Sequence, residues 1–142
     1  VGRQAGRGRG RADQADGRDH LPKLMRRPPS IDAFGGGGFR VSGAWRDGSL
    51  LILDDEPWDW PVKAIEDLTV AHFDTVIAAG LATVEFVLLG TGAVQKLPPK
   101  AVREALSEAR MGLEFMSTEA AARTYNVLAS EGRRMAAALI AV

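Results

Sequence analysis

Apolar and polar positions alternate along the chain in segments that predict strands and helices in turn. Residues 84–89 are almost all apolar, which is typical of a strand buried on both faces of a sheet. Two further apolar runs, at residues 113–116 and 135–140, predict strands, the second because Gly132 ends the helix before it. Helices are predicted from Thr69 to about Ala79, from Pro98 to Arg110 with Gly112 as the stop, and from Ser117-Thr118 to about Ser130.

The first part of the chain predicts hairpin structure. Residues 39–45 alternate as in a half-buried strand, and Asp47-Gly48 predicts a tight turn into a second strand at residues 49–53. The four glycines at 35–38 indicate a bend or bulge. They do not suit a phosphate-binding loop, because no Lys-Ser/Thr pair and no helix follow them. Residues 58–60 predict a short edge strand that Pro61 ends.

Together these elements predict an α/β domain with a central mixed, mostly parallel sheet and an N-terminal hairpin region. We expect residues 28–142 to form a single domain. Residues 1–27 are rich in Arg and Gly and poor in apolar side chains, so we expect a disordered tail or sequence upstream of the natural start. Arginines in this tail could contact RNA. The tail lacks the aromatic side chains on which bases stack, which disfavours such a role.

Composition and charge exclude several classes of protein. Among the 142 residues there are 18 basic and 18 acidic side chains, but residues 1–30 hold eight basic and three acidic ones. Residues 31–142 are therefore acidic, which argues against DNA binding. No apolar run approaches the roughly 18 residues of a membrane span, so we expect a soluble, cytoplasmic protein without a transmembrane segment.

The inventory of reactive side chains gives little support for catalysis. The chain has no cysteine, which removes thiol nucleophiles and cysteine-ligated metal sites, and it has two histidines. We interpret His72 as a structural histidine and the acidic residues Asp54, Asp55, Glu56 and Asp59 as a solvated turn. We predict no catalytic residue, no metal and no cofactor, and an enzyme is the less favoured hypothesis.

Two loops could form a small binding site. If the strands at 84–89 and 113–116 are parallel, Gly90-Thr91-Gly92 and Ser117-Thr118 lie together at the carboxyl edge of the sheet, where ligands of such folds gather. With Arg123 they would make an anionic-ligand pocket. The alternative is structural: a tight turn, a helix cap, and an ion pair between Arg123 and Glu119.

The helix that follows carries four polar residues in a row, Arg123, Thr124, Tyr125 and Asn126. Successive helical residues point about 100° apart, so at least one of the four should face inward and need a partner. Tyr125 and Asn126 therefore join the candidate ligand-binding residues, and a structural hydrogen-bond network is an equal alternative.

Several motifs occur in an order that resembles a known family. They are Gly90-Thr91-Gly92, Leu97-Pro98-Pro99, Ser117-Thr118, the block from Ala121 to Leu128, Glu131-Gly132-Arg133 and residues 136–140. The chain resembles, over about residues 30–142, the uncharacterised bacterial and archaeal domain family whose eukaryotic branch includes mitochondrial complex I assembly factor three. The resemblance implies a compact three-layer α/β fold and no established activity. Members often carry cysteine where this chain has Ala122, so no thiol mechanism carries over.

Two functional hypotheses follow. The first is a non-catalytic protein-interaction domain that aids assembly or maturation of a respiratory or membrane complex, with subunits or assembly factors of that complex as partners; a homo-oligomer is compatible with it. An exposed apolar patch near Trp45, Trp58 and Trp60 would favour this hypothesis. The alternative is a small-anion or nucleotide-binding domain, which a concave, positively polarised pocket at the sheet edge would favour.

Overall fold

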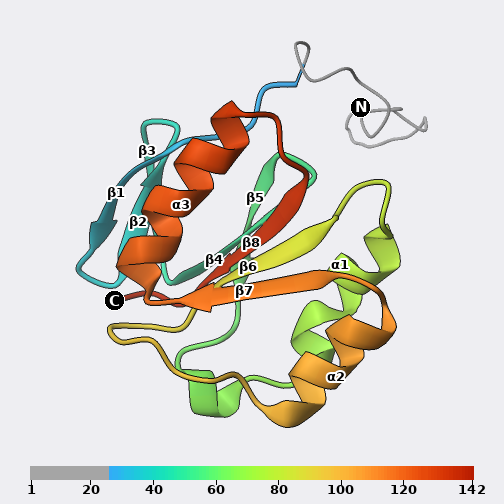
Figure 1. Ribbon diagram of the computed structural model, residues 1–142. Coiled ribbons are helices and arrows are strands. Elements are labelled where there is room, and N and C mark those ends of the chain that lie inside the picture. Colours follow the sequence, from blue (N-terminus) through green and yellow to red (C-terminus); the bar gives the residue numbers. More distant parts are fainter. Residues whose placement is uncertain (1–25) are drawn as a thin grey trace.

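The computed structural model describes residues 26–142 (Figure 1). The expected tail lies outside the described residues except for Arg26 and Arg27. Arg26 belongs to the folded part: its guanidinium donates two hydrogen bonds to the carboxylate of Asp55, at 2.7 and 3.0 Å, and a third to the carbonyl of Gly132. The described fold therefore includes a residue two positions before the expected boundary at 28.

The elements alternate as the apolar pattern predicts. The strands are β1 (Ile31–Gly35), β2 (Gly38–Val41), β3 (Ala44–Asp47), β4 (Ser49–Leu53), β5 (Glu56–Trp60), β6 (Phe86–Gly90), β7 (Gly112–Met116) and β8 (Met135–Leu139). The helices are α1 (Asp74–Ala79), α2 (Lys100–Glu108) and α3 (Thr118–Ser130), and two 3-10 turns, η3 (Ile65–Asp67) and η4 (Val70–Phe73), precede α1. Within residues 26–142, no helix has the length and apolar character needed to cross a lipid bilayer.

The central sheet is mixed, with strand order β5-β4-β8-β6-β7. Strand β6 pairs parallel with both β7 and β8, whereas β4 pairs antiparallel with both β5 and β8. The sheet thus has two parallel and two antiparallel pairings. Since β6 and β7 are parallel, the segments that follow them do emerge at the same edge of the sheet.

The elements form three layers (Figure 1). Two hydrophobic clusters lie between these layers. Helices α1 and α2 cover one face of the sheet, where Val87 and Leu89 of β6 pack against residues such as Phe73 and Leu106. Helix α3 and the small sheet β1-β2-β3 cover the other face. Alternate residues of β6 and β8 therefore belong to different clusters, which explains why both strands are apolar throughout.

The hairpin region differs from the prediction in its turns. Residues 39–45 do not form one strand, because Ser42 and Gly43 have positive φ angles of 47° and 85° and turn β2 into β3. The glycine run holds the turn between β1 and β2. Asp47-Gly48 leads from the small sheet into the central one, and β3 is not in the sheet of β4, so the predicted hairpin at this position is wrong.

The predicted helices are present, but the first begins as the 3-10 turn η4 and is α-helical only from Asp74, and the second is shorter than predicted. Helix α2 ends at Glu108 and the chain turns at Arg110, whose φ is 62°. Gly112, predicted as the helix stop, instead begins β7. A Cβ atom there would lie 3.1 Å from the Cβ atom of Phe86, so a small residue suits the close approach of β7 to β6.

Candidate functional site

The loops after β6 and β7 meet at the edge of the sheet, as predicted. Thr118 is fully buried, and its hydroxyl donates to the carbonyl of Ile140 at 2.6 Å and accepts from the backbone N–H of Gly92 at 3.0 Å. The backbone N–H of Thr118 donates in turn to the carbonyl of Gly92 at 2.9 Å. These bonds join the end of β6, the start of α3 and the end of β8.

Gly90 and Thr91 belong to the same junction. A Cβ atom on Gly90 would lie 2.9 Å from the hydroxyl of Thr118 and 3.0 Å from Leu139, so the close packing leaves no room for a larger residue. The hydroxyl of Thr91 lies 2.7 Å from the carbonyl of Val94 and accepts from the backbone N–H of Lys96 at 3.1 Å. It therefore holds the start of the loop that leads to α2.

Ser117 and Arg123 also have partners within the chain. The hydroxyl of Ser117 accepts from the backbone N–H of Ala120 at 3.3 Å, which is an N-terminal cap of α3. Arg123 pairs with Glu119 at 2.9 Å on the exposed side of α3. The structure thus brings Gly90, Thr91, Gly92, Ser117 and Thr118 together, and it uses all three of their hydroxyls internally; ligand binding by these residues stays a prediction.

Tyr125 and Asn126 connect α3 to the segment that leads into β1. The Tyr125 hydroxyl donates to the carbonyl of Pro29 at 2.7 Å, and the Asn126 side chain bonds both backbone polar groups of Ile31. Burial raises the pKa of the Tyr125 hydroxyl above its usual range. Tyr125 and Asn126 thus take part in a structural hydrogen-bond network, which was the alternative to ligand binding for this polar run.

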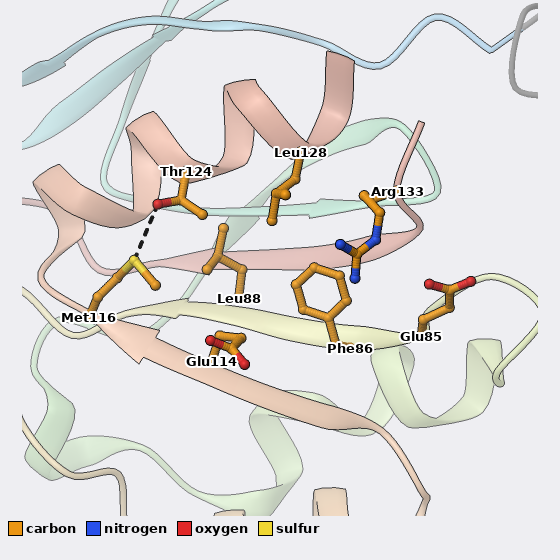
Figure 2. A pocket seen from close by; sticks show the side chains of 8 residues that line it. All are labelled: Glu85, Phe86, Leu88, Glu114, Met116, Thr124, Leu128 and Arg133. Atoms are coloured by element: carbon orange, nitrogen blue, oxygen red, sulfur yellow. Dashed lines mark hydrogen bonds between the residues drawn. The ribbon is translucent and has the colours of Figure 1, made fainter. Parts of the chain in front are cut away.

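A groove lies elsewhere, between α3 and the strands β6 and β7 (Figure 2). Its volume is about 370 Å³. Helix α3 packs mainly over β6 and β8, so it covers the α3-facing side of β7 only in part. The lining residues are Glu85, Phe86, Leu88, Glu114, Met116, Thr124, Leu128 and Arg133.

The groove combines an apolar floor with charged margins. Figure 2 shows Phe86 and Leu88 pointing from β6 toward α3, with Leu128 above them and the Met116 sulfur accepting from the Thr124 hydroxyl at 3.5 Å. The guanidinium carbon of Arg133 lies 4.9 Å from the centre of the Phe86 ring, a cation–π contact. An apolar side chain or the aliphatic part of a basic one would fit this arrangement.

None of the eight candidate residues from the sequence lines this groove. The available signal was Glu114, a charged residue that interrupts the otherwise apolar run of β7, together with Thr124 in the polar run of α3. How much of β7 is covered by α3 depends on the position of the helix over the sheet. Periodicity within one element does not determine that position.

The remaining candidates have structural partners. His72 accepts a hydrogen bond on Nδ1 from the backbone N–H of Thr69 at 3.0 Å, which completes a capping box at the start of the 3-10 turn η4. Trp60 is 5% exposed and its indole N–H donates to the carbonyl of His72, whereas Trp45 and Trp58 are about half exposed. Trp60 is therefore not part of an exposed patch of the kind that would favour a protein-interaction domain.

Across residues 26–142 no three His, Cys, Asp or Glu side chains are grouped so as to hold a metal ion.

Comparison with known proteins establishes the family. A family model described as "Protein of unknown function (DUF498/DUF598)" matches residues 31–140. The chain belongs to this family. The matched range begins with β1 and ends just after β8, so it includes both sheets, α3 and the groove.

Relatives of the chain occur in bacteria and in mammals. A Rhodobacter capsulatus protein described as uncharacterized is 39% identical over 110 residues, which cover 78% of this chain and 82% of that protein. The bovine protein named NADH dehydrogenase (ubiquinone) 1 alpha subcomplex assembly factor 3 is 30% identical over 132 residues, covering 90% of this chain and 71% of its own length. A crystal structure of a Bartonella henselae protein, described as an outer membrane protein, has a TM-score of 0.74 at 35% identity and covers 81% of this chain and 96% of its own. The resemblance and the three-layer α/β fold inferred from the sequence are thereby confirmed.

Proposed function

We propose that this chain is a non-catalytic protein-interaction domain that aids the assembly or maturation of a respiratory or membrane complex. The observation that carries the proposal is the 30% identity to the bovine assembly factor over 132 residues, which cover 90% of this chain. The relationship to a protein named as an assembly factor supports a role through contacts with other proteins.

The geometry supports a protein-binding role in two ways. The polar groups at the sheet edge are engaged within the chain, as described for Thr91, Ser117 and Thr118. Large apolar side chains are meanwhile exposed on an ordered loop: Val94 and Leu97 are 57% and 63% exposed. The Thr91 hydroxyl and the ion pair of Lys96 with Glu66 hold that loop in place.

The test is affinity capture by the full chain from native membrane and soluble extracts, followed by quantitative mass spectrometry. Reproducible enrichment of subunits or assembly factors of one respiratory or membrane complex is expected. Deletion of the gene should lower the amount of the same mature complex on native gels, and re-expression should restore it. A deletion strain with normal levels of every such complex would contradict the proposal.

The alternative, a small-anion or nucleotide-binding domain at Gly90–Gly92 and the start of α3, requires Arg123 to leave Glu119 and turn toward the loop. A thermal-shift series with phosphate, ATP and NAD tests it. A stabilisation that Arg123→Ala abolishes, while Arg110→Ala preserves it, would favour this alternative over protein binding.

A further inference from the structure

We propose that β7 and the groove beside it bind an extended segment of another protein, in which basic side chains alternate with apolar ones. This inference rests on the protein-binding role proposed above, and it names the surface and the chemistry of the partner. The segment would add a sixth strand to the central sheet, next to β7.

The outer edge of β7 offers backbone groups for such a strand. β7 ends the five-stranded sheet. The N–H of Gly112 donates to the carbonyl of Glu85, and the carbonyl of Met116 accepts from the N–H of Thr91, so residues 112 and 116 direct their polar groups toward the β6 side. Backbone groups of successive strand residues point to opposite edges. The N–H and C=O groups of Leu113 and Phe115 therefore point outward, and no residue from 26 to 142 pairs with them.

The side chains of β7 define what the added strand should carry. Glu114 is exposed on the face that α3 covers only in part, and within the described part of the chain it has no ion-pair partner. Leu113 and Phe115 are half-buried and point to the other face, where they pack beside the α2 cluster. Cross-strand neighbours on one face interact directly, so a basic residue beside Glu114 and apolar residues beside Leu113 and Phe115 would fit.

The groove can also accommodate the basic side chain that would lie beside Glu114. A Lys or Arg side chain beside Glu114 could lay its aliphatic stem against Met116 and Leu128 while its charge stays near the carboxylate. The other end of the groove already holds a cation, because Arg133 lies over Phe86, whose partner in the strand register is Gly112, two residues before Glu114. The charges therefore favour a basic side chain at the Glu114 end.

A second copy of this chain fits the same edge poorly. Antiparallel pairing of two β7 strands through Leu113 and Phe115 would place Glu114 directly opposite the Glu114 of the other copy. Like charges at opposed positions destabilise a strand pair. The edge therefore favours a partner of different sequence, and a charged residue on an edge strand is also a known protection against self-association.

The first experiment uses defined peptides with the full chain. The probe is an acetylated, amidated heptapeptide of alternating Val and Lys, compared with the Val-Glu heptapeptide and with a Val-Lys heptapeptide N-methylated on alternate residues. Binding is measured by fluorescence anisotropy, and amide exchange of Leu113 and Phe115 is followed by NMR. We expect binding of the Val-Lys peptide alone, with slower exchange at both amides. Absence of binding at 1 mM peptide, or binding that N-methylation leaves unchanged, would overturn the proposal.

Charge reversal provides the matched test. Glu114→Lys should weaken Val-Lys binding by roughly tenfold and allow the Val-Glu peptide to bind, because an attraction becomes a repulsion. Glu108→Lys is the control, since Glu108 is an exposed acidic residue at the end of α2 and does not line the groove. Equal effects of the two variants would show that net charge alone governs binding and would overturn the proposed site.

Capture from extract separates this inference from the protein-binding role. If the proposed surface is correct, Glu114→Lys loses the partners that the wild-type chain enriches, whereas the double variant Val94→Ser, Leu97→Ser keeps them. The reverse result would overturn the β7 surface and leave the protein-binding role standing. A wild-type chain that dimerises through β7 in sedimentation experiments, with Glu114→Lys changing the dimer, would also overturn the choice of partner.

Discussion

The side-chain amide of Asn126 binds both backbone polar groups of Ile31: it accepts from the N–H at 2.9 Å and donates to the C=O at 2.8 Å. Ninety-five positions separate the two residues, so this pair of bonds ties the middle of α3 to the first strand of the small sheet. An amide side chain has both N–H donors and a C=O acceptor, so it can satisfy the C=O and the N–H of one residue together. The pairing fixes where β1 lies along α3.

Asn126→Ala should lower the free energy of unfolding by about 2 kcal/mol, because it leaves both polar groups of Ile31 without their partner in a half-buried position. Urea unfolding followed by tryptophan fluorescence measures the change, and hydrogen exchange at the Ile31 amide should become faster. Val127→Ala, an exposed position of the same helix, serves as control and should change stability by less than about 0.5 kcal/mol. Equal costs for the two variants would contradict the role of Asn126.

Thr118→Val should be more costly, at about 3 kcal/mol. The substitution keeps the side chain's shape but removes the hydroxyl that Gly92 and Ile140 both use in a fully buried position. Thr118→Ser retains the hydroxyl and should cost about 1 kcal/mol for the lost methyl group. Denaturant midpoints of the two variants decide the matter, since a serine variant as unstable as the valine variant would rule out the hydroxyl as the cause.

Gly90→Ala tests the close packing at the same junction. The added methyl group would approach both Thr118 and Leu139 to about 3 Å, so a loss of about 2 kcal/mol is expected from overpacking. The comparison is Gly36→Ala in the β1–β2 turn, where the new methyl group meets nothing and the cost, about 1 kcal/mol, comes from the positive φ of 61°. If thermal denaturation ranked the two variants in the opposite order, packing at Gly90 would not be the limiting factor.

Stability at high pH should report on Tyr125. Its pKa is raised by burial above the ordinary value of about 10, so folding favours the protonated phenol. That contribution is fully present below about pH 10, the unfolded pKa, and is lost as the pH rises from there through the folded value. Tyr125 is the only tyrosine of the chain, so absorbance at 295 nm follows it alone.

The expected result is that tyrosinate absorbance appears together with unfolding and not in a separate step near pH 10. Tyr125→Phe should lose about 1 kcal/mol at neutral pH, because the bond to Pro29 is gone, and its stability should fall less steeply above pH 10. Titration of Tyr125 near pH 10 in a chain that is still folded would contradict this prediction.

The sequence predicted the parts of the fold that depend on local pattern. The apolar runs of β6 and β8 and the cap of α3 predicted these elements, and the structure supplies the parallel pairing of β6 with β7 on which the meeting of Gly92 and Thr118 depended. The turns of the small sheet were not predictable in the same way. Positive φ angles are expected at glycines, but Ser42 adopts one as well as Gly43. Asp47-Gly48 has the sequence of a hairpin turn but connects two sheets.

The groove could not be predicted from the sequence, for a different reason. Its residues come from β6, β7, α3 and the segment before β8, and what leaves it open is the position of α3 over the sheet. Contacts such as that of Asn126 with Ile31 and of Tyr125 with Pro29 set this position through residues nearly a hundred positions apart. A pattern within one segment carries no information about such pairs.

The place of β8 in the sheet has a consequence for synthesis. β4 and β6 are each hydrogen-bonded to β8 and not to one another, so the two halves of the sheet are joined by the strand that is translated last among these elements. A nascent chain on the ribosome therefore exposes two apolar strand edges until Met135–Leu139 has emerged. Unpaired edges of this kind are where nascent chains aggregate or recruit chaperones. Stalled nascent chains in which Met135–Leu139 has not yet emerged from the ribosome should accordingly bind ribosome-associated chaperones. Stalled chains in which this strand has fully emerged should not.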